Sequence, residues 1–148
     1  NCPISIMGTC AAKAEAQKEG HGIEIDGVFM EMPEGAACEK VKDQKFVNEQ
    51  PSYLREILEA NGAQQIYQEF VKEIAAQPKG FWGGYKSTEC FKVYQSFCPK
   101  FSEKGIELHC CRKAFYSDSS LSDEIRIWIV LVDKKKLPDF TPEYKWDG

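Results

Sequence analysis

The chain has 148 residues, of which 43% are hydrophobic and 28% charged, and its formal net charge is −4. These values predict one globular domain over residues 1–148 and exclude disordered, collagen-like and coiled-coil chains. No run of residues approaches the roughly 18 consecutive apolar positions of a membrane span. No nucleic-acid partner is expected, because duplex binders usually present a basic face. The one compact basic run, 134–136, is expected to be a solvated strand end.

The N-terminal third predicts a helix followed by a strand. Residues 11–19 are good helix formers and stop at Gly20, which is typical of a helix end. Residues 23–32 alternate between apolar and polar side chains, so they predict a single strand with Gly27 as a bulge. Residues 34–49 are mixed and charged, and we expect a short helix or a loop there.

Three helices are predicted in the middle of the chain. The first opens at 50–52 and ends at Asn61-Gly62, and the second carries an apolar stripe from Ile66 to Ile74. Residues 89–101 fit both a helical face and an alternating strand. Their length and their two face-aligned cysteines favour a helix.

The last third predicts two paired strands and an extended arm. Residues 106–116 and 125–132 form an antiparallel hairpin around the loop 117–123. The second strand is apolar on both faces, so it should be central and covered on both sides. Residues 137–148 are rich in proline and aromatic residues, which indicates an extended arm. The predicted class is α+β, with helices packed on an antiparallel sheet.

Cysteine is the most informative residue type. Seven cysteines occur in the chain: Cys2, Cys10, Cys38, Cys90, Cys98, Cys110 and Cys111. So many cysteines predict a disulfide-braced domain with two or three bridges, in a secreted, extracellular protein. The start at Asn1, directly before Cys2, fits a mature chain from which a signal peptide has been removed.

Geometry restricts the predicted pairing. Eight helical residues separate Cys90 from Cys98 by about 12 Å, beyond the limit of about 7 Å, so these two should not pair. Adjacent strand residues point to opposite faces, so Cys110 and Cys111 should have different partners. A local pair between Cys2 and Cys10 stays open. The odd total leaves at least one cysteine free or linked to another chain, and a link to a second copy would give a homo-oligomer.

No motif in the chain names a reaction. His109-Cys110-Cys111 is the one His–Cys cluster, and neighbours on a strand form neither a zinc site nor a Cys–His dyad. Neither a G-x-S-x-G elbow nor a calcium loop occurs. A pair of catalytic carboxylates stays open, because 23 acidic residues offer many combinations. We therefore expect no enzyme, no metal and no cofactor.

Aromatic residues, 12% of the chain, point to binding instead. They are enough to fill a core and also to line an apolar cavity between sheet and helices, for a lipid or pigment-like molecule. The candidate ligand-binding residues are Phe81, Trp82, Tyr85, Tyr94 and Trp128. The alternative is a secreted interaction module, an inhibitor or a disulfide-linked assembly component, whose exposed rings anchor a protein interface.

Overall fold

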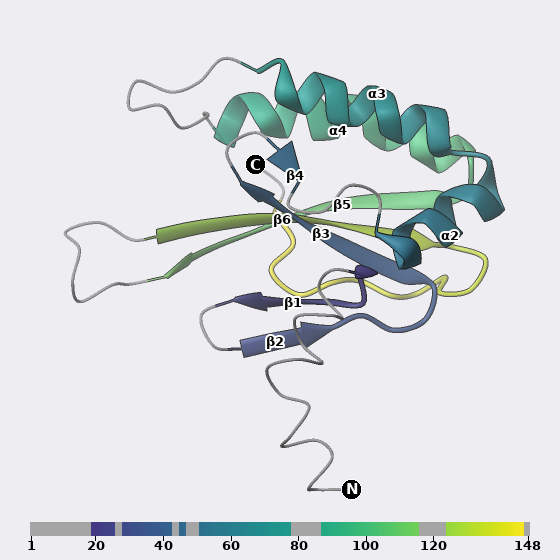
Figure 1. Cartoon of the computed structure of the whole chain (residues 1–148), viewed down its shortest axis with the longest axis horizontal. Helices are drawn as coiled ribbons and strands as arrows, with labels where there is room; N and C mark the ends of the chain where they lie inside the picture. The colour runs from purple at the N-terminus through teal and green to yellow at the C-terminus, as the bar shows by residue number, and fades with distance from the viewer. Residues whose placement is uncertain are drawn as a thin grey trace, which may run out of the picture.

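A four-stranded antiparallel sheet with helices on one face forms the centre of the molecule (Figure 1). The computed structural model describes residues 19–25, 28–42, 45–46, 51–77, 87–115 and 124–146. The strand order is β4-β3-β6-β5. The strands span Ala36–Lys42 (β3), Lys45–Phe46 (β4), Ile106–Phe115 (β5) and Glu124–Asp133 (β6). The prediction of an α+β fold with an antiparallel β5–β6 hairpin is confirmed.

Three helices pack on one face of this sheet, as predicted. They span Ser52–Asn61 (α2), Gln64–Ala75 (α3) and Ser87–Glu103 (α4). The core beneath them is aromatic and centres on Phe70, whose ring lies 5.3 to 6.2 Å from five other rings. Those rings belong to Phe46, Tyr67, Tyr94, Phe97 and Phe101. The helices therefore form because each buries an apolar stripe against the sheet.

A second, smaller core covers the opposite face of the sheet. A hairpin of Gly22–Ile25 (β1) and Val28–Glu31 (β2) lies there, together with the segment that follows β6 (Figure 1). The buried residues of this second core are Ile23, Ala36, Cys38, Cys111, Trp128, Val130 and Val132. Strand β6 lies between β3 and β5 and contributes alternate residues to both cores. The prediction that it is a central strand covered on both faces is confirmed.

Two predictions for residues 23–49 are wrong. The expected single strand over 23–32 is the β1–β2 hairpin, in which Ile25 pairs with Val28. The dipeptide between them in the sequence, Asp26-Gly27, is a common hairpin signal, so the bulge expected at Gly27 is replaced by the connection of two strands. The expected helix or loop over 34–49 contains β3 and β4 instead. The β3 sequence, AACEKVK, is poor in β-forming residues, so its position between β4 and β6 overrides its propensity.

The disulfide prediction is not supported for four cysteines. Cys38, Cys98, Cys110 and Cys111 form no disulfide, and all except the half-buried Cys98 are buried. Cys110 and Cys111 belong to the two opposite cores, as their adjacency on a strand predicts. The side chains of Cys2, Cys10 and Cys90 lie outside the described part, as do residues 11–18, Gly27 and the loop 117–123. Three remaining cysteines allow one bridge at most.

The predicted arm is described as far as Trp146, and it ends against the edge of the sheet. Its Phe140 and Leu137 pack on the second core, whereas Trp146 packs on the helix-side core. Near its end, Lys145 forms an antiparallel bridge with Cys111 of β5. The arm therefore wraps from one face of the sheet to its β5 edge.

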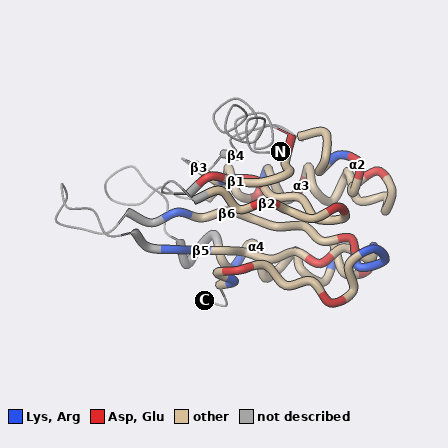
Figure 2. The backbone as a smooth tube through the Cα atoms, turned by 90° about the horizontal axis from the view of Figure 1, so that it is seen from below, with Lys and Arg blue, Asp and Glu red and all other residues tan. Residues whose placement is uncertain are grey.

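Charged residues of both signs are mixed over the described backbone (Figure 2). The three lysines 134–136 are exposed directly after β6, as expected for a solvated strand end. Two of them form ion pairs: Lys134 with Glu107 at 3.0 Å and Lys136 with Glu34 at 3.7 Å.

Candidate functional site: a groove between α4 and the edge of the sheet

An open groove of about 600 Å³ lies between α4 and the edge strand β5. One turn after another of α4 contributes a side chain to one wall, and residues 107–110 of β5 form the other. The lining residues are Phe91, Tyr94, Gln95, Cys98, Pro99, Ser102, Glu107, Leu108, His109, Cys110, Lys145 and Trp146.

Two aromatic rings of the groove lining pack on each other. The centroids of Phe91, on α4, and Trp146, on the arm, are 4.7 Å apart. The guanidinium of Arg112 lies 5.2 Å from the centroid of the Trp146 ring, in a cation–π contact. Trp146 is thus held between a helix and a strand that are distant from it in sequence.

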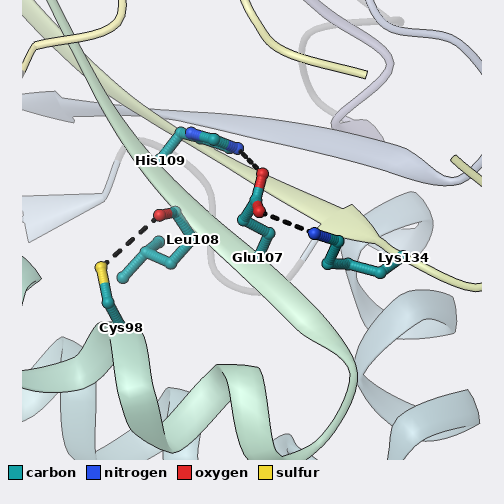
Figure 3. A network of polar contacts seen from close by, with 5 residues as sticks. All are labelled: Cys98, Glu107, Leu108, His109 and Lys134. Carbon is teal, nitrogen blue, oxygen red and sulfur yellow. Dashed lines mark hydrogen bonds and ion pairs between the residues drawn. The ribbon is translucent and has the colours of Figure 1, made fainter. Parts of the chain in front are cut away.

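The strand wall of the groove is the outer edge of β5, where backbone N–H and C=O groups point away from β6. The N–H of Arg112 donates to the carbonyl of Tyr144 at 3.1 Å, and the N–H of Trp146 donates to the carbonyl of Cys110 at 2.8 Å. Outward and inward groups alternate along an antiparallel strand, so Leu108, two residues before Cys110, also directs its backbone groups outward. The carbonyl oxygen of Leu108 accepts a hydrogen bond from the thiol of Cys98, with Sγ at 3.6 Å (Figure 3).

A chain of polar contacts lies beside the groove (Figure 3). Lys134 donates to one oxygen of the Glu107 carboxylate at 3.0 Å, and Nε2 of His109 bonds to the other. Burial lowers the pKa of His109 against the opposing effect of Glu107, and Lys145 and Lys134 add to the lowering. Partial burial acts to raise the pKa of Glu107, but the hydrogen bond from Lys134 and the contact with His109 lower it overall.

These contacts define the protonation of the buried histidine. His109 is only 4% exposed and neutral near pH 7, whereas Glu107 is ionised. A carboxylate only accepts hydrogen bonds, so Nε2 of His109 carries the proton and its N–H donates a hydrogen bond to Glu107. Nδ1 is then a buried acceptor, and it has no hydrogen-bond partner among the described residues.

The thiol of Cys98 and the imidazole of His109 bond to different partners. Figure 3 shows Cys98 reaching β5 from the α4 side, whereas His109 and Glu107, two residues apart on β5, bond to each other. Partial burial raises the pKa of Cys98, with a further contribution from Glu107, so its thiol is protonated at neutral pH. Burial raises the pKa of Cys111 to about 12, so this thiol is protonated too.

Two of the predicted ligand-binding residues, Tyr94 and Trp128, lie within the described part, and they belong to different cores. Tyr94 is buried on α4, in the core under the helices, and is one of the residues that line the groove. Trp128 is also buried, but in the second core, where its ring centroid lies 6.2 Å from that of Tyr144. The other three candidates, Phe81, Trp82 and Tyr85, lie outside the described residues.

Several lining residues were not identified as a site from sequence. Phe91 was recognised only as part of a helical face, and Leu108 only as a strand residue. Trp146 was recognised as a ring in need of a packing partner. The register that brings this ring back to β5 is a long-range property with no local signal.

A comparison of the chain with protein-family models, curated proteins and solved structures finds no match. None of the described helices is long and apolar enough to cross a membrane. Within the described residues, no three His, Cys, Asp or Glu side chains are grouped so that they could hold a metal ion.

Proposed function

We propose that this chain is a non-catalytic binding protein that holds an apolar small molecule in the groove between α4 and β5. The observation that carries the proposal is the lining of one open volume, which combines the partly buried rings of Phe91 and Trp146 with the buried residues Tyr94 and Leu108. Its volume of about 600 Å³ is within the range of small-molecule sites, which are mostly apolar with a few polar groups.

We propose a binding protein without catalysis because the thiol of Cys98 and the imidazole of His109 are not arranged as a nucleophile and its base. A nucleophilic cysteine needs a nearby base and a lowered pKa. Cys98 has a raised pKa, and the proton-bearing Nε2 of His109 is engaged by Glu107. A ligand can therefore sit beside these groups without meeting an assembled nucleophile.

A matched pair of variants on α4 tests the groove. Gln95 and Ser96 are both exposed, but only Gln95 lines the groove. The probe is N-phenyl-1-naphthylamine, an apolar dye whose emission rises in a dry site. Gln95→Trp should fill the groove and weaken dye binding by at least about tenfold, whereas Ser96→Trp should leave binding within about twofold of wild type.

The outcome separates this proposal from its rivals. Equal dye affinity in the two variants would place the dye elsewhere and refute the groove as the site. No dye binding by the wild-type chain would refute an apolar small-molecule ligand.

A second candidate, an interaction module, is favoured by one observation. Residues 144–146 already pair with the outer edge of β5, so this edge accepts an added strand.

We further propose, from the cysteine content alone, that the protein is extracellular and that its single allowed disulfide joins Cys2 and Cys10.

A further inference from the structure

The chemistry of the groove walls selects among ligands. Side chains of α4 line the helix wall, whereas on the strand wall the backbone groups of Leu108 and Cys110 point outward from the sheet, as the bond from Trp146 to Cys110 shows. A hydrocarbon pressed against this wall would shield those groups from water without replacing their hydrogen bonds, which is unfavourable. A ligand that carries its own alternating donors and acceptors would satisfy them.

The strand groups at Leu108 are weakly occupied. Its carbonyl accepts only a thiol among the described residues, at 3.6 Å from Sγ of Cys98. A thiol is a weak donor, so a peptide N–H would displace it readily. On the opposite wall, Pro99 lacks an N–H, so the carbonyl of Gln95 lacks its usual donor four residues along α4.

The arm shows how a strand is seated on this edge. Tyr144 and Trp146 exchange backbone hydrogen bonds with Arg112 and Cys110 in antiparallel register, and Trp146 turns its ring onto Phe91 of α4. The arm therefore combines backbone pairing to β5 with a side chain packed on the helix. The groove continues this seat along the same edge, past Leu108.

We propose that the ligand of this groove is an extended peptide that adds to β5 as an antiparallel strand at Leu108. Alternate side chains of the peptide point toward α4 and are apolar, to match Tyr94 and the thiol of Cys98, which contacts Leu108 from the helix wall. This inference rests on the proposed function for the place of binding, the groove between α4 and β5, and it replaces the apolar small molecule with a peptide whose apolar side chains face α4.

Backbone methylation of a model peptide tests the proposal. The probe is a capped, fluorescein-labelled heptapeptide of alternating threonine and valine. Two derivatives carry N-methyl groups on the amides of one edge or of the other. We expect one derivative to bind at least about tenfold more weakly than the parent in fluorescence anisotropy, and the other to bind within about twofold, because only one edge faces β5.

Hydrogen exchange of single amides provides the matching readout on the protein. The outward amide of Leu108 should exchange at least about tenfold more slowly when the parent peptide saturates the protein. The amide of Glu107 points toward β6 and should not change. Gln95→Trp should abolish the protection of Leu108, and Ser96→Trp should preserve it.

The results distinguish this inference from the proposed function. Equal affinity of both methylated derivatives, or no protection of Leu108, would overturn strand addition. Dye binding that depends on Gln95, without peptide binding, would also overturn it but would leave the groove as an apolar site. If neither probe binds, both proposals fail.

Discussion

His109 shows how one buried residue couples charge to stability. It bonds to Glu107, which bonds to Lys134, and the imidazole is buried and neutral at neutral pH. Protonation would place a positive charge near Lys145 and Lys134, both of which already lower its pKa. The folded state therefore binds this proton less readily than the unfolded state does.

The sign of the resulting pH dependence follows from linkage. The pKa of His109 is lowered below its ordinary value of 6.5 on folding, so its contribution to stability is complete above that value and is lost as pH falls below it. The free energy of unfolding should fall with a slope of up to about 1.4 kcal/mol per pH unit in that window. His109→Gln, which keeps a donor for Glu107, should remove this slope in urea titrations. An unchanged slope in the variant would show that another group is responsible.

Trp128 tests the second core at the level of one side chain. It is 1% exposed and packs with Val130, Cys111 and Ile23 on the face away from the helices. Trp128→Ala should lower the free energy of unfolding by about 3–5 kcal/mol, measured in urea, because a large buried ring leaves a cavity. Dye binding to the folded variant should persist, since Trp128 does not line the groove. A change near zero in stability would contradict the packing of this face.

Among the elements, the helices were the most predictable from sequence and β3 was the least. The stripes of α2 and α3 repeat at helical spacing and end at glycine or before proline, which are local signals. Strand β3 has no such signal, because its two alanines and its charged residues are placed by neighbouring strands. The groove could not be predicted either, since it depends on the arm returning to β5 over a separation of more than thirty residues.

Pro99 interrupts the backbone hydrogen bonding inside α4. Pro99 lies inside Ser87–Glu103 and is exposed, so it costs the helix a hydrogen bond without a large packing gain. Pro99→Ala should raise the free energy of unfolding, by up to about 3 kcal/mol, in chemical denaturation. It should also restore a donor for the carbonyl of Gln95. Destabilisation by this substitution would mean that the proline ring supports the groove wall more than it strains the helix.

At the scale of the whole molecule, two cores on one sheet replace the expected disulfide framework. The larger core lies under the helices and the smaller lies under the β1–β2 hairpin and the arm, and four of the seven cysteines are thiols within or beside them. Sequence composition indicated disulfides because cysteine is abundant. It carries no information on which cysteines approach each other.

Thiol counting tests this account of the whole chain. Protein isolated without reductant and unfolded in alkylating agent should show at least four modified cysteines, among them Cys38, Cys98, Cys110 and Cys111. Reduction before alkylation should add at most two further labels, the number that one disulfide releases. Mass spectrometry of the whole chain counts these labels. Two or three bridges would contradict the free thiols and restore the disulfide-braced prediction.

The binding groove is tested most directly by the reactivity of Cys98. This thiol is half-buried in the groove, whereas Cys38, Cys110 and Cys111 are buried, so N-ethylmaleimide should modify Cys98 faster than those three. Peptide mass mapping reads each site separately. With N-phenyl-1-naphthylamine at a hundredfold excess over its Kd, modification of Cys98 should slow by at least about tenfold, because the occupied groove excludes the reagent. An unchanged rate at Cys98 under saturating dye would show that the groove is not where the apolar ligand binds.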